Sequence, residues 1–450
     1  MDFFTKKMSE ISPMKKILAG YCLIILIGAL LLMLPIATRA GQRTSFLDCF
    51  FTATSATCVT GLIRFDTYTY WSLFGQIVIL LLIQIGGIGF VTFAISIISI
   101  TGAKIGMNSR YAMQESIAAP QMGGIIRMTK FIIRGSFILE LGGALLLSFY
   151  FCPRLGLLKG LYFSVFHSIS AFCNAGFDLM GNYTEFSSLT SVYDNWYFNI
   201  IIMALIVIGG LGFFVWKDLV DKKLKFKKYK LHTKIVVSVT VFLILSGALL
   251  IFIIENNNVV FEEKSLPEKI LMSLFQSVTT RTAGFNTMDL AAMKESSLFL
   301  MICLMLIGGS TGSTAGGIKT TTFAVLTLSI LSTFRRKKEV ECFGRRLEEN
   351  SLQDASCVFM MYIILCVVSS VIISSIENIP MLTSSFECVS AIATVGLTIG
   401  ITPKLCALSE FILSMLMLFG RVGSITILLA FSSNKRIKVS KLPHEKIKIG

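Results

Sequence analysis

Charged residues are scarce in this chain of 450 residues. Asp, Glu, Lys and Arg together make up 15% of it, whereas 54% of the residues are hydrophobic and the mean hydropathy is +0.76. This composition excludes a soluble globular protein, in which about a quarter of the residues are charged. Most of the protein surface is therefore expected to face lipid.

Residues that bind metals or catalyse reactions are also rare. The three histidines, His167, His232 and His444, are far apart in the sequence, and the 11 cysteines include no C-x-x-C pair. These absences argue against a zinc site, a metalloprotease and a disulfide framework, and no other catalytic constellation indicates an enzyme. The net charge of +15 does not predict a nucleic-acid partner, because the basic residues lie between hydrophobic segments.

Eight hydrophobic segments approach the roughly 20 residues that a helix needs to cross a bilayer. They lie near residues 17–37, 72–96, 135–152, 196–216, 235–254, 298–335, 357–376 and 411–432. Most of the 41 Lys and Arg residues fall in alternate connections, at residues 1–16, 97–130, 217–234, 333–356 and 433–450. The positive-inside rule then predicts a multi-pass protein of the cell (plasma) membrane with both termini in the cytoplasm. The Lys-rich stretch 217–230 could also contact anionic membrane lipid or an acidic partner.

Four semi-polar motifs recur on the predicted outer side, at intervals of about 110 residues. They read FTATSATCVTG (51–61), FHSISAFCNAG (166–176), FQSVTTRTAG (275–284) and FECVSAIATVG (386–396). Each motif lies between two hydrophobic segments, which predicts an all-α membrane protein with four membrane-pore-membrane repeats, eight transmembrane helices and four re-entrant pore loops. A unit with two spans begins and ends on the same side, so all four copies can surround one pseudo-fourfold axis, unlike inverted repeats.

The predicted organisation follows the period of these motifs. It comprises a cytoplasmic N-terminus (1–16), repeat 1 (17–100), repeat 2 (130–217), repeat 3 (231–338), repeat 4 (355–433) and a basic cytoplasmic C-terminus (434–450).

The motifs themselves predict a cation filter. Residues 46–57 are too short to cross the membrane and are predicted to form a pore helix, with Asp48 near its positive end. The strand after each pore helix ends in a glycine that could approach the axis and point carbonyl oxygens inward. The predicted filter residues are Val59, Thr60, Gly61, Asn174, Ala175, Gly176, Thr282, Ala283, Gly284, Thr394, Val395 and Gly396. Helix-packing glycines are the alternative, but packing alone does not explain a motif confined to the outer side.

The sixth segment must be interrupted, because residues 298–335 as one helix would extend about 57 Å, nearly twice the bilayer core. The interruption is predicted at GGSTGSTAGG (308–317), which has no bulky side chain. A phosphate-binding loop is disfavoured because Ile318 separates Gly317 from Lys319. A loop that gates the pathway and a plain kink that lines no pathway both remain open.

Ionisable residues within the hydrophobic segments are costly and point to function. We expect Arg421 to hydrogen-bond the interrupted segment and to form a cationic barrier beneath the filter. Arg281 is expected to point behind the filter toward a carboxylate, and Lys319 either to serve the pathway or to extend to the cytoplasmic surface. Glu140 is more typical of hydrogen bonding between helices than of ion coordination.

The CVTG, NAGF, RTAGF and TVGL segments and the eight spans resemble the Trk/Ktr/HKT superfamily of potassium transport proteins, most closely the membrane subunit of Ktr-type bacterial systems. The resemblance covers essentially the whole chain. It implies uptake of K⁺ through the glycine-lined filter, whose backbone carbonyls bind the ion, with Na⁺ as an activator and no organic cofactor. It further implies a homodimer docked on a cytoplasmic ring of nucleotide-binding RCK proteins. Gly61 stands where sodium-preferring plant relatives carry Ser, which favours potassium.

In the resemblance, the segment matching residues 308–317 is an intramembrane gating loop. The residues it implies for the gate are Gly308, Gly309, Ser310, Thr311, Gly312, Ser313, Thr314, Ala315, Gly316, Gly317 and Arg421. The alternative function is a Na⁺- or H⁺-coupled secondary potassium symporter with alternating access. Such a symporter needs a buried carboxylate near the midplane, for which Glu140 is the candidate.

Overall fold

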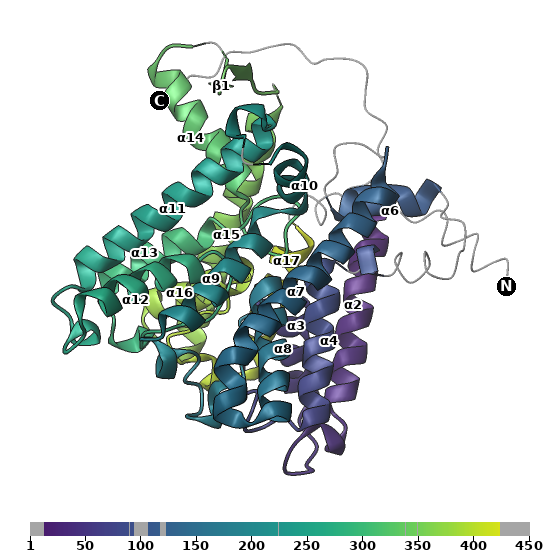
Figure 1. The fold of residues 1–450 in the computed structure, drawn as a ribbon, viewed down its shortest axis with the longest axis vertical. Coiled ribbons are helices and arrows are strands. Elements are labelled where there is room, and N and C mark those ends of the chain that lie inside the picture. The colour runs from purple at the N-terminus through teal and green to yellow at the C-terminus, as the bar shows by residue number, and fades with distance from the viewer. Residues whose placement is uncertain are drawn as a thin grey trace.

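The structure is a computed structural model that describes residues 13–89, 91–93, 107–117, 123–223, 225–337, 339–348 and 350–423. The predicted C-terminus (434–450), most of the predicted N-terminus (1–16) and the last part of repeats 1 and 4 lie outside these residues. Figure 1 shows an assembly built almost entirely of helices.

Each predicted repeat folds into a long helix, a pore helix and a second, shorter apolar helix. Repeat 1 contains α2 (Pro13–Leu32), α3 (Phe46–Thr57) and α4 (Leu73–Ile88). Repeat 2 contains α7 (Ile125–Leu155), α8 (Leu157–Cys173) and α9 (Trp196–Leu211). Repeat 3 contains α11 (Leu231–Glu255), α12 (Leu266–Thr279) and α13 (Glu295–Leu306), and repeat 4 contains α15 (Ser351–Glu377), α16 (Met381–Ile392) and α17 (Ala407–Val422).

The remaining elements connect these units. Helix α6 (Met107–Ser116) follows repeat 1, α10 (Phe213–Lys222) follows α9, and α14 (Thr320–Phe334) follows the interruption after α13. Strands β1 (Glu341–Cys342) and β2 (Arg345–Arg346) form a small antiparallel hairpin between α14 and α15. Single turns of 3₁₀ helix lie at η1 (Pro35–Ala37), η2 (Met180–Asn182), η3 (Thr190–Val192), η4 (Phe226–Lys228), η5 (Val259–Phe261), η6 (Leu290–Ala292) and η7 (Thr402–Lys404).

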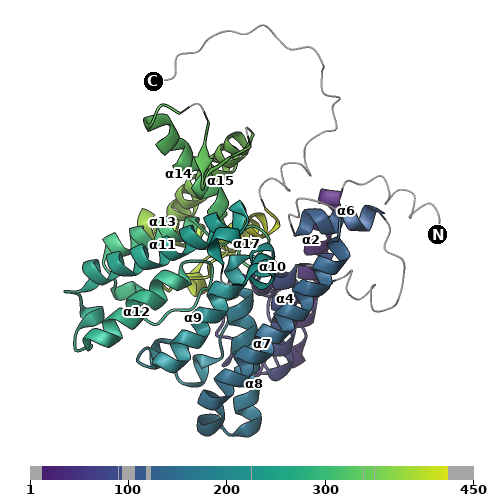
Figure 2. The ribbon, with the colours of Figure 1, turned by 45° about the horizontal axis from the view of Figure 1, so that its top comes forward.

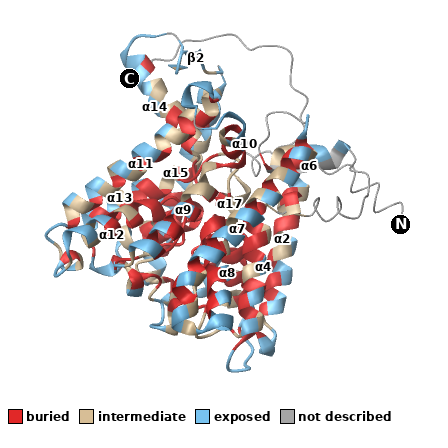
Figure 3. Ribbon diagram, in the orientation of Figure 1, coloured by how far each residue is buried: buried red, intermediate tan, exposed pale blue. Residues whose placement is uncertain are grey.

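The first helix of every repeat is long and apolar enough to cross a membrane. Among the described residues these are Met14–Leu32 within α2, α7, α11 and α15. Their outer faces expose large apolar side chains such as Leu145, Leu245 and Val367, whereas the buried residues concentrate at the centre (Figure 3). An apolar outer face is what a lipid environment requires, so these four helices form the lipid-facing wall.

The second helix of each repeat is shorter than predicted. Helices α4, α9 and α17 have 16 residues each, which corresponds to about 24 Å. They end at Gly89, Gly212 and Gly423, whose φ values of 92°, 97° and 91° interrupt helical geometry. At Gly212 the chain turns by 98° from α9 into α10.

A continuous span at 196–216 is therefore a wrong prediction, and the helices predicted at 72–96 and 411–432 end early, at Ile88 and Val422. A single glycine barely changes the mean hydropathy of a segment, but it accepts a positive φ that other residues resist. Apolar length therefore did not reveal these ends. The interruption predicted in the sixth segment is confirmed, since residues 307–319 separate α13 from α14.

The repeats are arranged around a buried centre. In Figure 1 the first two repeats, purple to blue, lie together on one side, and α11, α12 and α13 lie on the other. Figure 2 shows α14 and α15 projecting beyond the helix assembly at one end. Helix α17 of repeat 4 packs against α3 of repeat 1, so the last repeat contacts the first.

Charged side chains reinforce this contact between the first and last repeats. Arg64 follows the first filter segment, and its Nε lies 2.9 Å from a carboxylate oxygen of Asp48 in α3. The same guanidinium pairs with the buried Glu410 of α17. Since no covalent connection joins repeat 4 to repeat 1, these ion pairs help close the arrangement.

Candidate functional site

The predicted filter residues occupy four equivalent positions, each directly after a pore helix. Helix α3 begins and ends as predicted, and Asp48 lies in its first turn. The last residues of all four pore helices are buried, as are the segments that follow them. The four segments therefore lie inside the protein rather than against lipid.

The backbone of the four segments alternates in handedness. The residue two before each glycine has a positive φ: 58° at Val59, 60° at Asn174, 68° at Thr282 and 52° at Thr394. The glycines have φ values of 93° at Gly61, 70° at Gly176, 82° at Gly284 and 88° at Gly396. The single residue between each such pair does not have a positive φ. Left-handed residues at alternate positions turn successive carbonyls toward one side, the arrangement that a carbonyl-lined filter needs.

The four glycines form a closed ring. A Cβ atom added to Gly61 would lie 2.5 Å from the carbonyl oxygen of Ala175, and one on Gly176 would lie 2.9 Å from that of Ala283. A Cβ atom on Gly284 would lie 2.6 Å from the Val395 carbonyl oxygen, and one on Gly396 would overlap the Thr60 carbonyl oxygen. Each repeat thus contacts the next and the fourth contacts the first, so both the positive φ and the lack of space require glycine.

Hydrogen bonds from the pore helices hold these segments. The amides of Thr60, Ala175 and Val395 each donate to the carbonyl of a serine five residues earlier, at 2.8 Å, the serines being Ser55, Ser170 and Ser390. The side chains of Ser55 and Ser390 also accept from the amides of Gly61 and Gly396, both at 3.0 Å. In repeat 3 the motif is one residue shorter. There the Ala283 amide donates to the Thr279 carbonyl at 2.9 Å, and the Thr279 hydroxyl donates to the Phe285 carbonyl.

Our sequence reasoning did not identify these serine and threonine residues. The signal was present, because the fifth letter of all four aligned motifs is Ser or Thr.

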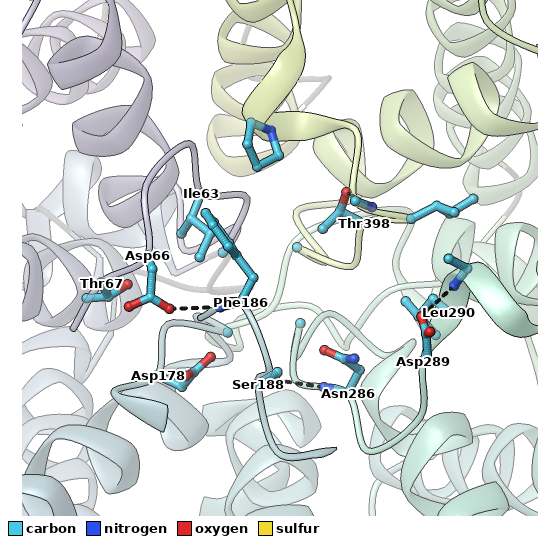
Figure 4. A pocket seen from close by; sticks show the side chains of 18 of the residues that line it. Ile63, Asp66, Thr67, Asp178, Phe186, Ser188, Asn286, Asp289, Leu290 and Thr398 are labelled. Carbon is cyan, nitrogen blue, oxygen red and sulfur yellow. Dashed lines mark hydrogen bonds between the residues drawn. The ribbon is translucent and has the colours of Figure 1, made fainter. Parts of the chain in front are cut away.

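A cavity of about 410 Å³ opens on one side of the ring and is lined by all four filter glycines. Its walls come from all four repeats, whose segments have different colours in Figure 4. Asp66, Asp178 and Asp289 line it together with the single cation Lys404, so its lining is acidic. An acidic cavity favours the approach of cations.

Loop contacts between repeats hold the walls of this cavity together. A carboxylate oxygen of Asp66 accepts from the amide of Phe186 at 3.0 Å, which joins repeats 1 and 2. The Ser188 hydroxyl accepts from the amide of Asn286 at 3.1 Å, which joins repeats 2 and 3.

The interrupted segment lies directly against the other side of the filter. A Cβ on Gly316 would overlap the side chain of Thr394, and one on Gly317 would lie 3.3 Å from the Ala393 carbonyl oxygen. The segment also pairs with the end of α9: the amide of Ser310 donates to the Gly210 carbonyl at 2.9 Å. These contacts favour the predicted gating loop over a kink remote from the pathway.

Two cationic side chains hold neighbouring carbonyls of the loop. Arg421 donates to the carbonyl of Thr314, as predicted, and also to those of Gly86 and Gly87 in α4. The Nζ of Lys319 lies 2.8 Å from the Ala315 carbonyl oxygen. Lys319 therefore serves the loop, and of the two interpretations left open, extension to the surface does not hold.

Arg281 holds the beginning of the same loop. Its guanidinium donates to the Gly308 carbonyl at 2.9 Å and is buried. The predicted partner, a carboxylate behind the filter, is therefore wrong. The reason is that the loop folds back under the filter and offers carbonyls whose hydrogen-bonding needs are not met within a helix.

A second cavity, of about 300 Å³, lies beyond the loop. It is lined by Thr311, Gly312, Ser313, Ala315 and Gly317 of the loop, and by Lys319, Arg421 and Glu115. The filter glycines and the loop thus lie between two cavities.

Glu140 of α7 lines neither cavity, although the Sγ of Cys173, directly before Asn174, lies 4.0 Å from one of its carboxylate oxygens. Both of its carboxylate oxygens accept from the Gln84 amide nitrogen of α4, at 3.0 and 2.9 Å. Within the described residues no group of three or more His, Cys, Asp or Glu could hold a metal ion. The contacts of Glu140 are those of a helix-joining residue, as expected.

Comparisons with known proteins agree with this arrangement. The TrkH family profile, described as cation transport protein, matches residues 16–439. The potassium/sodium uptake protein NtpJ of Enterococcus hirae is 39% identical over 447 residues, covering 98% of both chains. The Ktr system potassium uptake protein B of Bacillus subtilis is 39% identical over 434 residues, covering 96% of both.

A solved structure shows a similar fold. The potassium transporter TrkH from Vibrio parahaemolyticus superimposes with a TM-score of 0.72 at 19% identity, covering 92% of this chain and 83% of that chain. The fold, the apolar helices and the matches over the whole length lead to one conclusion: this chain is a multi-pass membrane protein that belongs to the TrkH family of cation transport proteins, and within it to the Ktr type.

Proposed function

We propose that this chain is a potassium-uptake membrane subunit that conducts K⁺ through the glycine ring and is gated by the loop at residues 308–317. One observation carries the proposal: four segments with alternating backbone handedness close into a ring between two cavities. A ring of backbone carbonyls can replace the water shell of a monovalent cation. The names of two relatives, both potassium uptake proteins, favour K⁺ as that cation.

The loop acts as a gate in this proposal because it lies beneath the filter and is held by cationic side chains. Arg421 and Lys319 add positive charge where a cation would leave the filter. Conduction then requires the loop and these two side chains to move away from the axis. A gate held by hydrogen bonds to carbonyls can be opened by modest forces, since each such bond contributes about 1.5–3 kcal/mol net.

Passive conduction is favoured over coupled symport. A symporter needs a buried ionisable group near the bilayer midplane that binds the coupling ion. The candidate, Glu140, binds Gln84 with both oxygens, and neither residue lines the two cavities described above. Its contacts give coupled transport no support.

The proposed assembly is supported in part by the names of the relatives. Three relatives are named as proteins of a Ktr system, which implies that each works with a partner subunit. We propose a homodimer in the plasma membrane, with both termini in the cytoplasm, docked on a cytoplasmic RCK-type nucleotide-binding ring and stimulated by Na⁺. The cavity lined by Arg421 would then open to the cytoplasm, and the acidic cavity would be the entrance.

Ion flux into liposomes tests the function. The purified protein is reconstituted, and uptake of K⁺, Rb⁺, Na⁺ and Li⁺ is compared under imposed gradients. We expect K⁺ and Rb⁺ uptake well above Na⁺ and Li⁺ uptake, without any Na⁺ or H⁺ gradient. Uptake that depends on a second ion's gradient would instead support symport, and equal uptake of all four ions would exclude a potassium filter.

A further inference from the structure

The side chain of Asn174 bridges the filter and the loop. Its Nδ2 lies 3.3 Å from the Arg281 carbonyl oxygen and 3.4 Å from Thr282 Oγ1, both in the filter segment of repeat 3. The hydroxyl of Thr314 in the loop lies 3.3 Å from Asn174 Oδ1 and 3.2 Å from the Phe172 carbonyl oxygen, so its one proton is shared between these two acceptors. One amide thus contacts a neighbouring filter segment with its nitrogen and the loop with its oxygen.

The end of α9 leaves space for this bridge. A Cβ on Gly209 would lie 2.8 Å from Asn174 Oδ1 and 2.9 Å from Thr314 Oγ1. A side chain at position 209 would therefore displace both partners. The bridge is fully enclosed, because Asn174 is 1% exposed and Thr314 is completely buried.

Arg281 completes a circuit back to the loop. Its carbonyl accepts from Asn174, and its guanidinium donates to the Gly308 carbonyl at the start of the loop. The contacts run from Thr314 through Asn174 and Arg281 to Gly308, so the first residue of the loop and a later one are tied to the same part of the filter. Water cannot readily replace a lost partner in a buried network, so its members tend to move together.

We propose that Asn174 is a positioning residue that couples the gate to the filter: the filter discriminates between cations better while the bridge from Asn174 to Thr314 is intact than when it is broken, and the loop keeps this bridge as the gate opens. This inference rests on the proposed function, because it needs a filter and a gate. It differs from a purely local role, in which Asn174 only tolerates the left-handed backbone at the end of α8.

Two substitutions and their combination test the coupling. Asn174→Gly keeps a residue that accepts φ of 60° but removes the amide, and Thr314→Val keeps the shape but removes the hydroxyl. We measure the ratio of Rb⁺ to Na⁺ uptake in liposomes for the wild type, both single variants and the double variant. Each single variant should lower the ratio about fivefold, the effect of one net hydrogen bond. The double variant should lower it no further than the stronger single variant.

Matched controls exist elsewhere in the chain. Asn378 ends α15 with a φ of 52° and is exposed, so Asn378→Gly repeats the same change outside the filter. Thr327 is exposed on α14 and its hydroxyl bonds the Phe323 carbonyl, so Thr327→Val repeats the other change. Both controls should leave the ratio at the wild-type value.

The outcomes separate the coupling from the proposed function. If the wild type does not favour Rb⁺ over Na⁺, the filter itself fails. If the wild type selects but the two single variants do not change the ratio, or their effects multiply in the double variant, the coupling is wrong and the filter stands. A third result against it would be a shortened loop that conducts faster with an unchanged ratio.

Discussion

Replacing Gly284 by Ser should reduce the preference for potassium over sodium. A Cβ at this position would lie 2.6 Å from the Val395 carbonyl oxygen and 3.0 Å from the Cα of Gly176. To restore an ordinary contact of 3.4 Å, the distance to the carbonyl oxygen must increase by about 0.8 Å, and overpacking of this kind costs about 1–3 kcal/mol. The φ of 82° adds about 1–2 kcal/mol for a residue with a side chain.

This cost should appear as lost selectivity, because the displaced carbonyl belongs to the ring that replaces the ion's water shell. If about 1.4 kcal/mol of the strain is expressed as a difference between the barriers for the two ions, the Rb⁺ to Na⁺ uptake ratio falls about tenfold. The assay is uptake by liposomes containing purified protein, after size-exclusion chromatography has verified that the variant is folded.

Two further variants isolate the cause. Gly284→Ala introduces the Cβ without a hydroxyl and should act in the same direction. Gly41→Ser also places a side chain at a positive φ, 66°, but nothing lies within 4 Å of its Cβ position, so the ratio should not change. An unchanged ratio in a folded Gly284→Ser protein would contradict the assignment of the filter.

Three other predictions concern the gate, the packing and the entrance. Deleting Ser310–Gly316 should raise Rb⁺ uptake, and a folded deletion variant with equal or lower uptake would remove the gate role. Gly420→Ala places a methyl group against the Ile392 carbonyl and should destabilise the protein by about 1–3 kcal/mol in thermal unfolding, whereas Gly142→Ala, with open space around it, should not destabilise it. Burial raises the pKa of Asp178 to about 7, so this carboxyl loses its charge as the pH falls through 7. Rb⁺ uptake at low ionic strength should therefore decrease as the pH is lowered through 7. In the Asp178→Asn variant this decrease should be absent.

Features that depend on local chemistry could be predicted from the sequence. Ser45, Asp48 and the absence of glycine in residues 46–57 define the pore helix, whose bounds match the expected ones. The run 308–317 is rich in glycine, which destabilises a helix, and has no bulky side chain, so the interruption of the sixth segment was also predictable.

Features that depend on contacts between distant residues could not be predicted in this way. The carbonyl that pairs with Arg281 is 27 positions away, and the loop hydroxyl that reaches Asn174 is 140 positions away. Neither pair has a local pattern, because each forms only when the loop folds back beneath the filter. The same holds for Arg64 and Glu410, which meet only because repeat 4 returns to repeat 1.

The sequence by itself determined that the chain lies in a membrane, repeats four times and carries a glycine after each pore helix, because apolar length, period and residue type are all local properties. Only the tertiary structure decided that these glycines close into one ring and that Asn174, Arg281 and Lys319 hold the loop against it. The physical reason is that a buried polar group must find a partner wherever the fold brings one, and that partner is a property of the packing, not of the neighbouring residues.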